Sequence, residues 1–159
     1  MSIVYNAIGI IHTPFTELEQ MPIQPTGEAS AGGHIEIYPD FVAGLKDLDG
    51  FSHLILLYHL HKAADPELVV IPFLDTEAHG VFATRAPVRP NPLGLSVVRL
   101  TGIRGNILHF AALDILDGTP LLDIKPYIPE FDAPGGVRIG WLETVRGGVR
   151  SIRSDDRFS

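Results

Sequence analysis

The sequence contains no cysteine, which removes several classes of site from consideration. Disulfide bonds, thiolate metal sites and a catalytic cysteine are all excluded for these 159 residues. The chain also lacks an apolar run of membrane-spanning length. Its N-terminus, MSIVYNAIGI, has neither the basic start nor the small-residue cleavage site of a secretory signal. We therefore expect a cytoplasmic protein without a membrane contact.

Charged residues are scarce and unevenly distributed. They form 19% of the chain against 45% hydrophobic residues, which favours one compact globule over a disordered chain. The net charge of −7 argues against a general nucleic-acid binder. Residues 1–80 nevertheless contain no arginine, whereas residues 81–159 contain nine, a residue type suited to gripping phosphate. The arginines either form one positive face or are scattered and solvated.

The hydrophobic pattern predicts short strands separated by turns. Loosely or strictly alternating apolar residues indicate strands at 4–12, 34–38, 51–61, 95–103, 107–116 and 121–125. A tight turn at 104–106 makes two of these strands a hairpin. Residues 14–33 form a long Pro/Gly-rich loop, and residues 65–77 a loop with a brief strand interrupted at Pro72.

Only one short helix is expected, at 41–48, with Asp40 as its N-cap. Residues 137–143 are expected to form a last strand or an edge segment. This pattern predicts an all-β, mainly antiparallel sandwich or barrel with one short helix and long Pro/Gly-rich loops.

The stretch 83–96, ATRAPVRPNPLGLS, is the most distinctive part of the chain. Its prolines fix the backbone and remove donors, so the segment is a stiff, non-helical track. A stiff track loses little entropy on binding, so Arg85 and Arg89 would be in position before a ligand arrives. The alternative is a proline-rich surface loop with two solvated arginines.

Three other segments accompany this stretch: MPIQP at 21–25, GFSHLILLYHLHKA at 50–64 and DGTPLLDIKPYIPEFD at 117–132. In this order, the four segments resemble the TsaA-like (TrmO) family of S-adenosylmethionine-dependent tRNA (adenine-N6)-methyltransferases. The resemblance runs from about residue 5 to about residue 145. It implies a TsaA-like β-barrel domain at 1–145, which forms a homodimer with the cofactor site near the interface. Residues 146–159 would be an arginine-rich, mobile tail, without the second C-terminal domain of many bacterial members.

The resemblance also implies a site for S-adenosylmethionine. Its expected residues are Pro22, Ile23, Gln24, His61, Lys62, Arg85, Leu95, Asp117, Gly118 and Thr119. Leu95 would face the adenine, and the Arg85 guanidinium would pair with the donor's carboxylate. Many long bacterial members have arginine where Ile23 stands, so a charge contact there is missing. No G-x-G-x-x-G turn or βαβ repeat is present to hold this cofactor in the more usual way.

The acceptor in the family is the N6 nitrogen of threonylcarbamoyl-adenosine beside the tRNA anticodon. This nitrogen loses a proton, so a base is expected, with Asp117 and His61 as the catalytic candidates. Arg89 and Asn91 would face the acceptor. Lys125 and Tyr127, with Phe131, would supply phosphate and stacking contacts to the RNA, or else serve in packing.

Three alternative functions remain open at the level of sequence. The same cofactor-binding fold would serve an enzyme with a small-molecule acceptor. It would also serve a non-catalytic dimer that binds S-adenosylmethionine as a signal. A metal-dependent hydrolase is the third, because His59 and His61 would share one face of a strand, although a third ligand is not evident. We favour the reading without a metal.

Overall fold

The computed structural model describes residues 1–18 and 32–149. The chain forms two compact units. The first unit comprises Met1–His61 and Leu93–Tyr127, and the second comprises Lys62–Pro92 and Ile128–Ser159. No helix within the described ranges is long and apolar enough to cross a bilayer.

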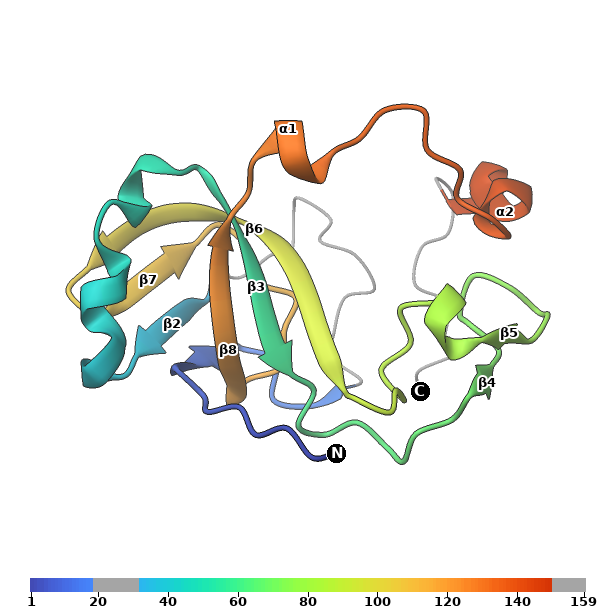
Figure 1. The fold of residues 1–159 in the computed structure, drawn as a ribbon, viewed down its shortest axis with the longest axis horizontal. Helices are drawn as coiled ribbons and strands as arrows, with labels where there is room; N and C mark the ends of the chain where they lie inside the picture. The colour runs from blue at the N-terminus through green and yellow to red at the C-terminus, as the bar shows by residue number, and fades with distance from the viewer. Residues whose placement is uncertain (19–31, 150–159) are drawn as a thin grey trace. The chain divides into compact units, whose positions relative to one another are not determined.

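The first unit is a closed barrel of antiparallel strands (Figure 1). The strands are β1 (Gly9–His12), β2 (His34–Ile37), β3 (His53–His59), β6 (Leu93–Arg104), β7 (Ile107–Phe110) and β8 (Thr119–Pro126). They follow the ring order β1-β2-β7-β6-β3-β8, and β1 closes the ring by pairing with β8. The expected all-β, mainly antiparallel barrel is confirmed.

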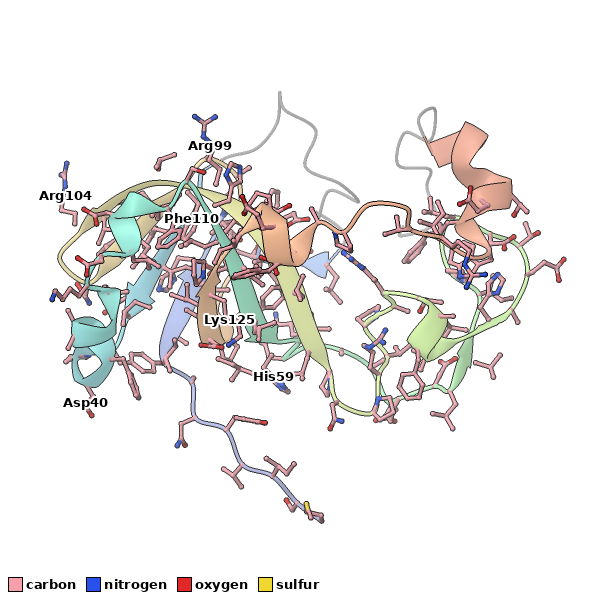
Figure 2. The ribbon with its side chains drawn as sticks, turned by 45° about the horizontal axis from the view of Figure 1, so that its top comes forward. Asp40, His59, Arg99, Arg104, Phe110 and Lys125 are labelled. Carbon is pink, nitrogen blue, oxygen red and sulfur yellow. The ribbon has the colours of Figure 1, made fainter. Side chains whose placement is uncertain are left out.

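The barrel core follows from the alternation of apolar residues along the strands. On β2, Ile35 and Ile37 are buried while His34 and Glu36 are exposed, and β3 buries Leu54 and Leu56 in the same way. The buried core residues are Ile11, Ile35, Ile37, Leu54, Leu56, Tyr58, Val98, Leu108, Phe110, Leu113, Ile115 and Leu121. Figure 2 labels Phe110, which is 3% exposed.

Strand β6 is longer than expected because it pairs with two neighbours in succession. Its first part pairs with β3 as far as Arg99, and its last part pairs with β7. The hairpin to β7 turns at Gly105, whose φ of 63° favours glycine, so the predicted turn is confirmed. The predicted strand 107–116 is too long: β7 ends at Phe110, and residues 111–116 form an irregular segment that still buries Leu113 and Ile115.

Two other boundaries differ from the expectation. The first strand begins at Gly9 rather than at residue 4, because residues 1–6 are exposed and lie outside the barrel. The predicted helix is two 3₁₀ segments, η2 (Pro39–Leu45) and η3 (Leu48–Gly50). Asp40 is not the N-cap; Tyr38 precedes η2, and no side chain caps it.

The second unit contains short elements: β4 (Val69–Val70), β5 (His79–Gly80), η4 (Val81–Ala83), α1 (Pro129–Asp132) and α2 (Leu142–Val149). Strand β4 confirms the brief strand before Pro72. The predicted strand at 137–143 is wrong. Gly136 and Gly140 have positive φ values that interrupt an extended chain, and α2 begins two residues after Gly140. Helix α2 continues past residue 145, and residues 150–159 of the expected tail lie outside the described residues.

Candidate functional site

One end of the barrel brings together two of the distinctive sequence segments. The end of β3 lies beside the starts of β6 and β8, because His59 is the Cα partner of Leu93 and Tyr58 that of Leu121. His61 follows β3 directly, and the turn 117–118 precedes β8. These chain ends meet because β3 is antiparallel to both of its neighbours.

Thr119 links these segments through its hydroxyl group. It is 2% exposed, and its Oγ1 donates to the carbonyl of Leu116 at 2.6 Å. The same oxygen lies 3.4 Å from Nδ1 of His61. A hydroxyl has one proton, so at His61 the Thr119 oxygen acts as the acceptor.

Asp117 binds the chain that follows β1. Its Oδ1 accepts from the backbone N–H of Thr13 at 3.0 Å, and its own N–H donates to the carbonyl of Phe15 at 2.7 Å. The hydroxyl of Thr13 donates to the carbonyl of Ile115 at 2.6 Å, and the N–H of Gly118 donates to that of Ile11 at 2.9 Å. We call residues 11–15 and 115–119 together the β1–β8 junction.

His12 adds a side-chain contact to this junction. Its Nδ1 lies 3.5 Å from Oδ1 of Asp117, and its Nε2 lies 3.9 Å from Oε2 of Glu36. Its ring stacks on that of His34, the first residue of β2, with centroids 5.0 Å apart. The sequence predicted no role for His12 or Thr13. Their partner Asp117 is about a hundred residues away in the chain, so no local pattern reveals the contact.

Leu95 lies on an apolar stretch of the barrel's outer surface. Leu93, Leu95 and Val97 alternate along β6 and are 48%, 50% and 49% exposed. Their cross-strand partners on β3 include Leu57 and Ile55. An apolar surface of this kind suits a flat base or another protein chain.

Lys125 and Tyr127 lie at the other end of β8. Lys125 lies six positions after Thr119, a span of about 20 Å along a strand. The Nζ of Lys125 is 2.8 Å from Oδ2 of Asp123, and this contact raises the lysine's pKa. The backbone N–H of Tyr127 donates to the carbonyl of His53, at the start of β3. Within one chain these two residues are therefore not close to the His61–Thr119 contact.

In the second unit, Arg85, Asn91 and Lys62 are exposed, whereas Arg89 is half-buried. The Nη1 of Arg89 donates to the carbonyls of Val81, Thr84 and Ala86, at 3.1, 2.8 and 3.3 Å. Its guanidinium also lies over the ring of Phe82. Arg89 therefore shapes the loop that carries Arg85, a contribution that the sequence did not predict.

A second set of contacts supports the same loop. The indole N–H of Trp141 donates to the carbonyl of Ala83 at 2.8 Å, and its ring stacks on His79 with centroids 4.5 Å apart. The Nε2 of His79 lies 2.7 Å from Oδ2 of Asp75. This hydrogen bond, with help from the backbone N–H of Thr76, lowers the pKa of Asp75.

The predicted site is not described in full. Pro22, Ile23 and Gln24 lie outside the described residues. The premise for a metal site also differs from the expectation, because β3 ends at His59 and His61 lies beyond the strand. Across residues 1–18 and 32–149, no three His, Asp or Glu side chains gather in a way that would hold a metal ion.

Comparison with known proteins covers most of the chain. Residues 10–133 match the family model described as the tRNA-methyltransferase O N-terminal domain. A probable S-adenosyl-L-methionine-binding protein of Pyrococcus abyssi is 54% identical over 99% of this chain and 86% of its own length.

Two further relatives have names that state an activity. The tRNA (adenine(37)-N6)-methyltransferase of Escherichia coli is 37% identical over 80% of this chain and 59% of its own length. The crystal structure of TrmO from Pseudomonas aeruginosa superposes with a TM-score of 0.74 at 40% identity, covering 89% of this chain and 63% of that one. The chain thus spans about three fifths of these two relatives.

Proposed function

Because this chain belongs to the family of the tRNA-methyltransferase O N-terminal domain, we propose that it is an S-adenosylmethionine-dependent methyltransferase. Its acceptor would be N6 of threonylcarbamoyl-adenosine next to the anticodon in tRNA. The observation that carries this proposal is the hydrogen bond between Thr119 and His61, because it joins two of the four segments that resemble the family.

The described residues fit such a methyl donor. Leu95 presents half of its side chain on an apolar surface, which suits an adenine ring. Arg85 is exposed and comes just before the three prolines of its loop. Its planar guanidinium is therefore available to a carboxylate. Gly118 has a φ of 76°, which a residue with a side chain adopts only with strain, and Asp117 and Thr119 flank it. We propose Pro22, Ile23, Gln24 and Lys62 as further donor contacts on the resemblance alone.

The protein contributes to methyl transfer mainly by positioning the donor and the acceptor, rather than by bonding covalently to either. When bound, S-adenosylmethionine would supply a methyl group attached to a positively charged sulfur. The acceptor nitrogen would form a bond to the methyl carbon, and the sulfur would leave in line with the electrons of the C–S bond. The nitrogen's proton passes to a base, for which Asp117 and His61 are the candidates. Arg89, Asn91, Lys125 and Tyr127 remain proposed contacts for the acceptor.

We also propose that the protein acts as a homodimer. The outer surface of β6 and β3 supports this, because Leu93, Leu95 and Val97 leave about half of each side chain exposed. A dimer that covered this surface would also place Leu95 at the interface, close to the proposed donor site.

The first experiment measures binding of S-adenosylmethionine by calorimetry. The wild-type chain is expected to bind, and Arg85→Ala to bind at least about tenfold more weakly, because a charge-assisted pair is lost. The matched control is Arg104→Ala, another exposed arginine, which projects from the barrel at the β6–β7 hairpin (Figure 2). The absence of binding by the wild-type chain would contradict every form of the proposal.

The second experiment identifies the acceptor. The protein and the methyl donor are mixed with tRNA from cells that lack their own N6-methyltransferase, and the nucleosides are analysed by mass spectrometry. We expect one methyl group on threonylcarbamoyl-adenosine and none on tRNA without the threonylcarbamoyl group. Donor binding without any tRNA methylation would contradict the tRNA acceptor and leave a small-molecule acceptor or a non-catalytic binding dimer. Incubation with a pool of cell metabolites separates these two alternatives. The enzyme with a small-molecule acceptor would consume S-adenosylmethionine, whereas the non-catalytic dimer would not.

A further inference from the structure

Phe82 is an exposed aromatic residue at the start of residues 81–92, which we call the arginine-containing loop. It is 75% exposed, whereas its neighbour Val81 is fully buried. Both residues belong to η4, within the second compact unit. Single exposed apolar side chains are common on protein surfaces, so the surroundings of the ring decide what it can do.

The backbone that carries Phe82 is held by hydrogen bonds on both sides of the ring. The carbonyl of Val81 accepts from the backbone N–H and from the hydroxyl of Thr84, at 3.1 and 2.8 Å. The carbonyl of Ala83 accepts the indole N–H of Trp141 at 2.8 Å. The ring is therefore presented to solvent from a fixed backbone, which lowers the entropy lost when a ligand packs against it.

Arg89 places a cation beside this ring. Its guanidinium lies over the ring of Phe82, 5.9 Å from the ring centroid. The Nη1 of Arg89 also donates to three carbonyls of the loop, among them that of Val81 at 3.1 Å, and these bonds keep the cation where it is. Because Phe82 is 75% exposed, much of its ring surface stays open to a second planar group.

The charge of the loop favours RNA as the partner of this ring. Residues 81–92 contain Arg85 and Arg89 and no acidic residue, in a chain whose net charge is −7. Arg85 is exposed. Single-stranded RNA is recognised by aromatic rings on which its bases stack, together with cationic side chains that attract its phosphates. The arginine-containing loop combines both features within a few residues.

We propose that Phe82 is a stacking platform for a nucleobase in the single-stranded anticodon loop of the tRNA acceptor. The base stacks on the open part of the ring, and the positive charge of Arg85 and Arg89 attracts the RNA backbone. Phe82 binds and positions the RNA and takes no part in the bonds that form and break. This inference rests on the proposed function and adds a contact that the sequence did not predict.

The first test compares substitutions at Phe82 that keep or remove the flat ring. Phe82→Leu keeps an apolar side chain without a π-face, whereas Phe82→Tyr keeps the ring. We expect Phe82→Leu to raise KM for tRNA at least about tenfold, and Phe82→Tyr to stay within about threefold of the wild type. The affinity for S-adenosylmethionine, measured by calorimetry, should stay within about threefold in both.

Tyr5→Leu is the matched control, because Tyr5 is 71% exposed and lies outside the arginine-containing loop. It should leave KM for tRNA unchanged. An unchanged KM in Phe82→Leu would overturn the inference, since the ring would then make no contact with the RNA. An equal rise in Phe82→Leu and Phe82→Tyr would also overturn it, because stacking is retained by the second. Weaker donor binding in Phe82→Leu, with normal KM for tRNA, would assign the ring to the donor's adenine instead.

A fluorescence measurement reads stacking directly and needs no methyl transfer. An indole that stacks on a base loses fluorescence, so the emission of Phe82→Trp should fall as unmethylated tRNA is added. The wild-type chain, whose one tryptophan is Trp141, supplies the blank. Methylation of tRNA without this quenching would overturn the stacking contact and leave the proposed function in place. Quenching without methylation would support the stacking contact and contradict the proposed function.

Discussion

Gly94 lies against the ring of Tyr58, and this contact explains the glycine in the stretch PNPLGLS. A Cβ at this position would overlap ring atoms Cε2, Cζ and Cδ2 of Tyr58. The ring has little freedom to move away, because it is 8% exposed and its hydroxyl is 2.8 Å from Oγ of Ser96. The sequence predicted a strand here but gave no reason for the glycine, since Tyr58 is far away in the chain.

We expect Gly94→Ala to lower the free energy of unfolding by about 1–3 kcal/mol, the usual range for overpacking a filled site. Urea denaturation of the purified chain measures this change. Gly102→Ala on the same strand is the matched control, because a Cβ there meets nothing within 4 Å and its φ is not positive. Its change should stay within about 1 kcal/mol, and equal effects of the two substitutions would contradict the packing explanation.

Asp75 provides a prediction about pH. Its pKa lies below the ordinary value of 3.8 because it accepts hydrogen bonds from His79 and from backbone N–H groups. The unfolded chain therefore binds more protons than the folded chain between the two pKa values. The stabilisation is present above about pH 4 and is lost as the pH falls through the folded pKa.

Thermal unfolding of the wild-type chain and Asp75→Asn from pH 6 to pH 2.5 tests this sign. The wild-type chain should be more stable at pH 6, and the difference should shrink as the pH falls below 4. Asp65→Asn, at an exposed carboxylate of the same unit, is the control. A difference that grows on acidification would show that the contact with His79 does not favour the charged carboxylate.

At the scale of elements, the arginine-containing loop depends on contacts that the local pattern did not reveal. Residues 84–92 form no helix, as the prolines indicated. The pattern did not reveal that Arg89 bonds three carbonyls of the loop, or that Trp141 reaches it from the segment before α2. The alternation in VRIGWLE suggested a strand, but two glycines with positive φ and the helix that follows decide otherwise.

Trp141→Phe tests this support. Phenylalanine keeps an aromatic ring to stack on His79 but lacks the indole N–H that binds the Ala83 carbonyl. The loss of one such hydrogen bond should cost about 1 kcal/mol locally. We expect faster amide exchange at residues 81–84 with the barrel amides unaffected. Arg138→Ala, at an exposed position in the same segment, should leave exchange at 81–84 as it is in the wild type.

At the scale of the whole molecule, composition and period-2 patterning were sufficient to predict an antiparallel sandwich or barrel, and the resemblance to the family favoured the barrel. They were not sufficient to predict ring closure or the β1–β8 junction. Both depend on pairs such as Ile11 with Thr119 and Thr13 with Asp117, which are brought together only by the fold. The proposed donor contacts came from the resemblance to the family rather than from the pattern.

The apolar outer surface of β6 gives a prediction about assembly. Val97→Glu places a charge where a second copy would cover it, which is costly without a partner. We expect this variant to be monomeric in light scattering at concentrations where the wild-type chain is a dimer. Phe41→Glu is the control, because Phe41 is a 40% exposed apolar residue on η2 and not on the proposed interface strand β6. A wild-type monomer, or a Val97→Glu dimer, would contradict the proposed interface.

Ring closure by β8 has a consequence for how the protein is made. A nascent chain that ends at residue 110 already has five of the six barrel strands, yet β1 and β3 still lack the strand that joins them. Thr119 and Asp117 have not yet been synthesised, so the contact of Thr119 with His61 and that of Asp117 with Thr13 are still absent. The barrel therefore closes only after β8 has emerged from the ribosome.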